Sequence, residues 1–216
     1  MSGKEGYPYS QAILKYIMIS CPEYQSEFAS SNQVYTPIVS IPSYVMFCNA
    51  IVNTVEELNG KRLRISGASW ARWAKNFGRL SVAIPIHEVY EVLEQGFVDC
   101  TFLSPAELAN FNLHDVVKNI TTDVPGGLYA AGRATTLNRD PWNRFNTREN
   151  EGPLKAGRIM AAYVSFLYQQ QADSDMIKAE KKGINILDGR RQFPRKIKRF
   201  YQRRSKIFPG ILRRRI

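Results

Sequence analysis

The apolar positions between residues 55 and 103 follow two different periods. Trp70, Trp73, Ala74 and Phe77 recur at i, i+3, i+4 and i+7, which is the spacing of an amphipathic helix. Short apolar and β-branched runs on either side of them have the length of strands. Strands and helices that alternate with short connections predict a parallel sheet flanked by helices. The expected strands cover residues 62–65, 81–84 and 97–103, and the expected helices cover 55–59, 67–78 and 88–95.

The flanking regions predict further elements. Strands are expected over residues 34–39, 44–47 and 128–137, and short helices over 10–19 and 112–120. The longest expected helix begins at Pro153, a residue suited to the first helical position, and ends before Gly183. It would span about 45 Å, long enough to run across two lobes, and a strand over 184–187 would follow it. One face of this helix is formed by Ile159, Met160, Tyr163, Phe166, Leu167, Met176 and Ile177.

The net charge of +11 is concentrated in one terminal segment. Residues 189–216 contain twelve Lys and Arg and no Asp or Glu, whereas the rest of the chain has 18 basic and 19 acidic residues. Aromatic residues are interleaved with this basic tail, a pattern that suits nucleic acid or an anionic membrane surface. A solvated extension has the same composition. The body of the protein is therefore close to neutral.

Cysteine and histidine usage limits the possible chemistry. Cys21, Cys48 and Cys100 are odd in number, far apart and without a C-x-x-C pair, which favours three free and mostly buried thiols. His87 and His114 are too few for a histidine-rich metal site. Neither accompanies a nucleophile motif such as G-x-S-x-G, and the sequence has no phosphate-binding or dinucleotide-binding glycine loop. We therefore expect no catalytic residues, no metal and no cofactor.

Two targeting signals are missing from the sequence as given. It has no apolar run of eighteen or more residues, so no membrane-spanning helix is expected. Its first twenty residues lack the basic lead and the uninterrupted apolar region of a signal peptide. The protein is then either cytoplasmic or an exported protein without its leader.

Arg64 lies near the end of the predicted strand 62–65, directly before Ser66, Gly67 and a helix. Ligands of open α/β sheets bind at the carboxyl ends of parallel strands. A guanidinium there can pair with a carboxylate through two parallel hydrogen bonds, and the N–H groups of the helix N-terminus favour an anion. The alternative is an exposed strand residue in a basic patch with Lys61 and Arg62. The pattern favours binding of an acid over catalysis.

Two segments of the chain resemble a known family. They are VEELNGKRLRISG, from Val55 to Gly67, and PIHEVYEVLEQGFVD, from Pro85 to Asp99. In combination they are similar to the DctP-type solute-binding proteins of TRAP transporters, the tripartite ATP-independent periplasmic transporters. The segment NRDPW, from Asn138 to Trp142, is similar to the one that precedes the long helix of that family. The resemblance covers about residues 35–187.

The resemblance implies a periplasmic-binding-protein-like α/β fold, with a mainly parallel sheet flanked by helices and a long helix that spans the lobes. It implies a periplasmic protein that captures a small organic acid, without catalysis, for import by TRAP membrane permease subunits. The arginine that binds the ligand carboxylate in the family corresponds to Arg64. Other residues that line the ligand pocket in the family correspond to Ser66, Trp70, Phe102 and Ser104, although Trp70 also suits a core position.

We expect four regions along the chain. Residues 1–43 are the remnant of an incomplete first lobe, 44–138 a ligand-binding α/β lobe, 139–188 the long helix with its return strand, and 189–216 the basic tail. Some members of the family carry another arginine about one strand earlier, where this chain has apolar and aromatic residues around Tyr44. The ligand is then expected to be less acidic or bound differently. The basic tail departs from the family, and the alternative function is binding of nucleic acid or an anionic membrane surface through it.

Overall fold

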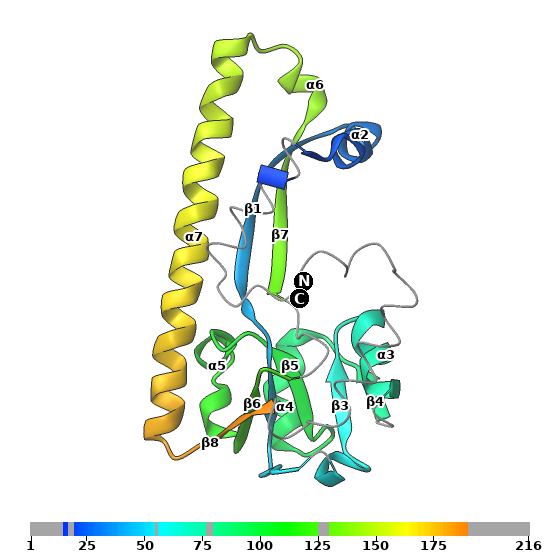
Figure 1. The fold of residues 1–216 in the computed structure, drawn as a ribbon, viewed down its shortest axis with the longest axis vertical. Coiled ribbons are helices and arrows are strands. Elements are labelled where there is room, and N and C mark those ends of the chain that lie inside the picture. The colour runs from blue at the N-terminus through cyan, green and yellow to red at the C-terminus, as the bar shows by residue number, and fades with distance from the viewer. Residues whose placement is uncertain (1–14, 17–19, 55, 77–79, 125–129, 190–216) are drawn as a thin grey trace. The chain divides into compact units, whose positions relative to one another are not determined.

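The computed structural model describes residues 15, 16, 20–54, 56–76, 80–124 and 130–189 (Figure 1). The chain divides into two compact units, the first made of residues 1–43 and 129–174 and the second of residues 44–128 and 175–216. Each unit is built on its own sheet. The helix expected over 10–19 lies largely outside the described residues.

The second unit is built on a six-stranded mixed sheet with the order β4-β3-β5-β2-β6-β8. Its strands are β2 (Val45–Cys48), β3 (Arg62–Ile65), β4 (Leu80–Ala83), β5 (Cys100–Leu103), β6 (Asn119–Thr122) and β8 (Asn185–Asp188). β3 is parallel to β4 and β5, and β8 is parallel to β6, whereas β2 is antiparallel to β5 and β6. The connections contain α3 (Ala68–Asn76), α4 (Val89–Glu94), α5 (Glu107–Asn110), η2 (Glu56–Leu58), η3 (Ile86–Glu88) and η4 (Leu113–Asp115). The predicted α/β class is confirmed.

Each face of this sheet has its own core, because successive side chains of a strand point to opposite faces. One core contains Met46, Cys48, Leu63, Cys100 and Phe102 from the strands and Ala74 from α3. The other contains Val45, Phe47, Leu103 and Ile120 from the strands and Val89 and Leu93 from α4. Both faces are covered, which explains why β2 and β5 are buried along their whole length without alternation.

The first unit contains a two-stranded antiparallel sheet, in which β1 (Gln33–Ser43) pairs with β7 (Ala130–Asn138). Helices α2 (Pro22–Ser30) and α6 (Arg139–Trp142) flank it, and α7 (Thr147–Lys181) belongs to this unit up to Ser174. The hydroxyl of Ser165 on α7 accepts a hydrogen bond from the backbone N–H of Ser40, with an N···O distance of 3.0 Å. Small side chains thus let α7 approach β1 closely.

The apolar residues that the sequence places on one face of α7 are largely exposed. The side chains of Ile159 and Tyr163 are 62% and 61% exposed, and Met160, Phe166, Leu167 and Ile177 are exposed as well. The buried positions of α7 are small or polar: Ala161, Ser165, Ala172, Asp175 and Ala179. The 3.6-residue pattern of apolar residues therefore does not mark the face of α7 that is buried within this chain.

The start of α7 differs from the prediction. The helix begins at Thr147 and not at Pro153, which lies inside it. Asn146 and Glu149 form a reciprocal cap, in which the Asn146 side chain accepts from the Glu149 N–H and the Glu149 carboxylate accepts from the Asn146 N–H. Gly152 precedes Pro153 and has no Cβ to clash with the proline ring, which makes the proline tolerable there. The 35-residue helix is about 52 Å long.

The helix predicted over residues 112–120 is wrong. Asn112 has a φ of 53°, in the left-handed region, and only the short turn η4 follows it. Residues from Asn119 onward form β6, which pairs with β2 and β8. Sheet pairing therefore determines this segment, and the local apolar spacing does not.

The prediction of three free thiols is also wrong. Cys48 on β2 and Cys100 on β5 form a disulfide with an S–S distance of 2.08 Å, and Cys21 is free. The two residues are directly opposite each other in the antiparallel β2–β5 pair, and both are fully buried. A disulfide of this kind persists in an oxidising compartment.

Gly189 offers a test of the packing at the end of β8. A Cβ at this position would lie 2.6 Å from the carbonyl oxygen of Thr122 and 3.0 Å from Cα of Val124, both backbone atoms. We expect Gly189→Ala to lower the free energy of unfolding by about 1–3 kcal/mol in denaturant titrations, because the backbone must shift. In Gly157→Ala the new Cβ meets the ring of Pro37 at 3.0 Å. There the helical preference of alanine offsets the contact, and we expect a change below about 1 kcal/mol. Equal losses in both variants would contradict this packing.

Candidate functional site

Arg64 is the buried cationic residue of the second unit among the described residues. It is the third residue of β3, it is 2% exposed, and its Nε donates a hydrogen bond to the carbonyl oxygen of Ile84 at 2.8 Å. Burial lowers the pKa of the guanidinium, and electrostatic interaction with Tyr44 raises it. A guanidinium stays protonated in proteins, so the site carries a positive charge. The alternative of an exposed strand residue is thereby ruled out for Arg64.

No carboxylate within the described ranges forms an ion pair with Arg64. Its neighbour Arg62 pairs with Asp99. The other buried charged side chain of the described ranges, Asp175, has His114 and Lys178 within 4 Å. Because an uncompensated buried charge is costly, the surroundings of Arg64 favour an anion.

Ser66 and the start of α3 lie directly after Arg64. Ser66 is exposed, and α3 begins at Ala68. The backbone N–H groups of Trp70 and Ala71 both donate to the carbonyl oxygen of Gly67 and close the first turn. The order strand, bend and helix N-terminus is as predicted, and it adds favourable potential for an anion beside Arg64.

Trp70 and Phe102 form part of a ladder of aromatic rings. The Trp70 ring is stacked between Tyr44, with centroids 5.7 Å apart, and Phe102, with centroids 4.9 Å apart. Phe102 belongs to the core on the α3 face of the sheet, and Tyr44 and Trp70 pack against that core. Arg64 lies between Leu63 and Ile65 on β3 and so starts from the opposite face. Trp70 therefore has the core position that the sequence also allowed.

Ser104 is fully buried just after β5. Its hydroxyl accepts a hydrogen bond from the Ala106 N–H at 3.4 Å, and its carbonyl accepts from the Glu107 N–H at 3.0 Å. Ser104 thus shapes the turn into α5. Because β3 and β5 are parallel neighbours, Ser104 after β5 and Ser66 after β3 follow the same ends of their strands.

Two residues near Arg64 were not predicted from the sequence. Tyr44 reaches this edge because β2 runs antiparallel to β5, so that the start of β2 lies beside the end of β5. Thr101 is opposite Arg64 in the β3–β5 register, is fully buried, and its hydroxyl has no hydrogen-bond partner within the described part of the chain. Neither could be found without the strand order.

Asp99 ties the start of β3 to the turn before β5. Its Oδ2 accepts from the backbone N–H of Arg62 at 2.7 Å and from Arg62 Nε at 3.2 Å. Burial raises the pKa of this carboxyl, but the hydrogen bonds and the charge of Arg62 outweigh burial and hold the pKa below its ordinary value. This interaction explains the aspartate that closes the second motif segment.

The pH dependence of stability follows from the lowered pKa of Asp99. The folded state favours the ionised carboxylate, so its contribution is complete above the pKa of the unfolded chain and is lost as the pH falls through the lower folded pKa. In Asp99→Asn we expect a weaker fall in the free energy of unfolding below about pH 4 than in the wild type. Denaturant titrations at several pH values measure this, with the exposed Asp140→Asn as control. Parallel pH curves for wild type and Asp99→Asn would contradict it.

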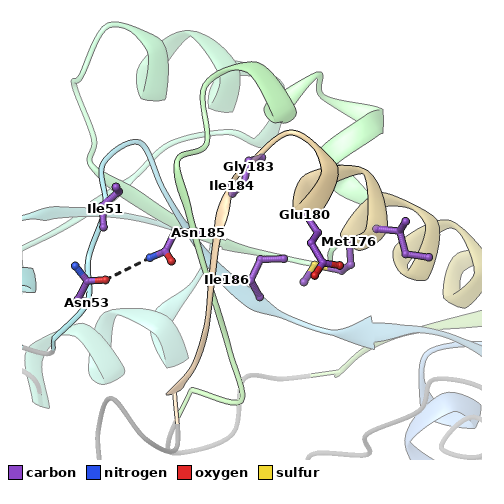
Figure 2. A pocket seen from close by; sticks show the side chains of 9 residues that line it. Ile51, Asn53, Met176, Glu180, Gly183, Ile184, Asn185 and Ile186 are labelled. Carbon is purple, nitrogen blue, oxygen red and sulfur yellow. Dashed lines mark hydrogen bonds between the residues drawn. The ribbon is translucent and has the colours of Figure 1, made fainter.

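A hollow of about 920 Å³ lies at the other edge of the same sheet (Figure 2). It is formed by β8, by the end of α7 and by Ile51 and Asn53, and the Asn185 amide donates to Asn53 Oδ1 across it. Glu180 is the charged side chain in its lining. β5, β2 and β6 separate β8 from β3, so this hollow is distinct from the surroundings of Arg64. Its charge does not suit an acid.

The sequence model of the bacterial extracellular solute-binding proteins, family 7 (DctP), matches residues 44–206. The chain belongs to this family. The resemblance predicted from the sequence is thus confirmed. The match runs into the basic tail, so the prediction that the tail departs from the family is wrong up to Lys206.

Solved structures of TRAP periplasmic solute-binding proteins share the fold of this family 7 protein. One from Bordetella bronchiseptica, with bound (R)- and (S)-mandelate, is 22% identical with a TM-score of 0.75, over 94% of this chain and 63% of that one. One from Xanthobacter autotrophicus, with bound β-D-galacturonate, is 18% identical with a TM-score of 0.70, over 89% and 68%. One from Chromohalobacter salexigens, with bound D-glucuronate, is 14% identical with a TM-score of 0.74, over 93% and 67%. The chain therefore spans about two thirds of the length of these proteins.

Proposed function

We propose that this family 7 solute-binding protein captures a small organic acid through its carboxylate and delivers it to TRAP membrane permease subunits. The observation that carries the proposal is Arg64, a buried cation without an ion-pair partner among the described residues. An anionic ligand supplies the missing countercharge. The fold neighbours from three bacteria hold carboxylates, namely mandelate and two uronates.

The geometry around Arg64 suits a carboxylate. The hydrogen bond from Nε to the Ile84 carbonyl fixes the plane of the guanidinium. The terminal nitrogens of an arginine held in this way can bind both oxygens of a carboxylate. Ser66 and the first N–H groups of α3 are the next donors along the chain, and we propose that they complete the anion site. Because Arg64 is 2% exposed, neighbouring side chains must move to admit the ligand, and association should be slower than the usual rate.

We propose that Trp70, Phe102 and Ser104 contribute to this site in a different way. Trp70 stacks on Tyr44 and Phe102 stacks on Trp70, so these two rings restrict the position of the Tyr44 ring. Ser104 fixes the turn after β5 through its hydrogen bond with Ala106. These three side chains thus stabilise the structure of this edge of the sheet, whereas Arg64 contacts the carboxylate of the ligand.

A periplasmic location is part of the proposal. The family consists of extracellular proteins, and the disulfide between Cys48 and Cys100 suits an oxidising compartment such as the periplasm. No helix within the described ranges is long and apolar enough to cross a membrane. Delivery to a permease then takes place at the membrane that this compartment adjoins.

A panel of organic acids tests the proposal. Thermal unfolding is measured with monocarboxylates, dicarboxylates and uronates at millimolar concentration, and a ligand at 100 times its Kd is expected to stabilise the protein by about 2.7 kcal/mol. Neutral alcohols and amides of the same carbon skeletons serve as controls. Equal stabilisation by the acids and their neutral counterparts, or no stabilisation by any acid, would contradict carboxylate capture.

A further inference from the structure

The hollow beside β8 has a candidate occupant in the same chain. We infer that residues 193–208 of the basic tail, the tail segment, pack into this hollow as an amphipathic helix with their basic side chains in solvent. Two observations carry the inference: the hollow is apolar with an acidic side chain, and the tail that follows β8 has an apolar and a basic face. The inference goes beyond the proposed function, because three strands separate this hollow from β3.

The hollow lies within the second unit and presents apolar side chains to solvent. Its lining comes from the loop after β2, the end of α7 and β8 (Figure 2). The large apolar residues of the lining are Ile51, Met176, Ile177, Ile184 and Ile186. Of these, Ile51 is 59% exposed and Ile177 is 54% exposed. Exposed apolar side chains that gather around a hollow of about 920 Å³ favour an apolar partner.

Glu180 gives the hollow a negative charge. It is the charged residue of the lining, it is exposed, and it forms no ion pair with any residue of the described ranges. The basic tail has no Asp or Glu, so its cations have no acidic partner within the tail itself. Complementary charges at the rim of an apolar contact determine which partner docks and in which register. The hollow therefore favours an apolar surface that also carries a cation.

The tail segment has a sequence pattern that matches the hollow. Its apolar residues recur with the spacing of one helix face, and they are Phe193, Ile197, Phe200, Tyr201, Ile207 and Phe208. The basic residues that fall on the other side of such a helix are Arg195, Lys196, Lys198, Arg199, Arg203 and Lys206. Arg204 falls on the apolar side, one turn from Phe200, where it would meet Glu180. Pro194 suits the first helical turn, and Pro209 suits the end of the helix.

The tail segment also follows the hollow closely in the chain. Gly189, the last described residue, comes three residues after Ile186 of the lining, or about 10 Å at the rise of a strand. Phe193 follows four residues later and can lie at most about 14 Å from Gly189. The family model matches as far as residue 206, so most of the tail segment belongs to the part of the chain that the family shares. This favours packing on the lobe over a solvated extension.

Amide hydrogen exchange of the full chain tests the docking. In the wild type the backbone amides of residues 195–206 should exchange at least about tenfold more slowly than in a synthetic peptide of residues 190–216. Ile177→Glu should remove most of this protection, because it places a carboxylate against the apolar face of the segment. Leu80→Glu is the matched control, since Leu80 is 63% exposed and lies on the strand at the opposite end of the sheet. Exchange of the tail at the peptide rate in the wild type, or equal protection in the two variants, would overturn the inference.

Charge reversal locates the contact. Glu180→Arg should speed exchange of the tail segment about two- to fivefold, the range of one exposed ion pair replaced by a repulsion. Glu180→Arg combined with Arg204→Glu restores opposite charges and should recover most of the protection. Glu91→Arg on α4 is the control, since Glu91 is exposed and not part of the lining. Protection that is equal in Glu180→Arg and Glu91→Arg, or a double variant no better than Glu180→Arg, would refute the pairing of Arg204 with Glu180.

Two further readouts separate the docking from other roles of the tail. A basic amphipathic helix also suits an anionic membrane surface. Protection of the tail segment that arises only after addition of vesicles containing phosphatidylserine would therefore refute docking in favour of membrane binding, whereas protection without vesicles supports docking. Acid binding should be unchanged in Ile177→Glu, because the hollow is distinct from the surroundings of Arg64. Loss of acid binding in that variant would contradict a separate docking site.

Discussion

Replacing Arg64 with methionine is expected to abolish acid binding while leaving the ligand-free protein at least as stable as the wild type. Methionine keeps much of the volume of the side chain and removes a buried charge that has no acidic partner within the described residues. Replacement of a buried ion pair by apolar side chains is often neutral or stabilising, and a buried charge without a partner is more costly to keep than a paired one. Loss of the charge-assisted contact should weaken affinity at least about 100-fold, corresponding to roughly 3 kcal/mol or more.

Arg62 provides the matched control on the same strand. Arg62→Met removes the ion pair with Asp99, so it should lower the melting temperature and leave affinity within about threefold of the wild type. Arg64→Lys keeps the charge without the planar fork and should have intermediate affinity. Calorimetric titration and thermal unfolding of the three variants measure both quantities. Arg64→Met with unchanged affinity, or Arg62→Met with the larger loss of affinity, would rule out Arg64 as the carboxylate ligand.

Reduction of the disulfide between Cys48 and Cys100 is expected to cause the largest loss of stability. The bond closes a segment with a sequence separation of 52 residues. In the chain-entropy model a closed loop of this length contributes about 4 kcal/mol, because the cross-link restricts the unfolded chain. This is a large fraction of the total stability of a typical domain.

Denaturant titrations of the oxidised and reduced protein measure this contribution. The double variant Cys48→Ala/Cys100→Ala should unfold at a lower denaturant concentration than the oxidised wild type, as should the reduced wild type. Cys21→Ser is the control, since Cys21 is a free cysteine outside the sheet. Coincident curves for the oxidised and reduced protein would show that the cross-link contributes nothing to stability.

Local sequence patterns predicted the elements that are determined by short-range physics. β3 has the predicted bounds, and the predicted helix after it agrees closely with α3. Gly96 and Gly183 have φ values of 70° and 76° at the ends of α4 and α7, as expected for residues that end helices. The helix predicted over residues 112–120 failed for a long-range reason: residues 119–122 form a strand because β2 and β8 pair with them.

The candidate site likewise has features that local sequence predicts and features that only the tertiary structure determines. Arg64 could be singled out from the sequence, because a strand, a short bend and a helix N-terminus are local features and the family motif marks the same residue. That Arg64 has no ion-pair partner among the described residues could not be predicted, since it depends on which side chains the fold brings near it. The pairing of Cys48 with Cys100 requires β2 to lie antiparallel to β5, a pairing across more than fifty residues. The sequence by itself determined the family, the α/β pattern and the arginine. Only the tertiary structure decided the surroundings of that arginine, because strand order is set by packing over the whole sheet and not by any local run of residues.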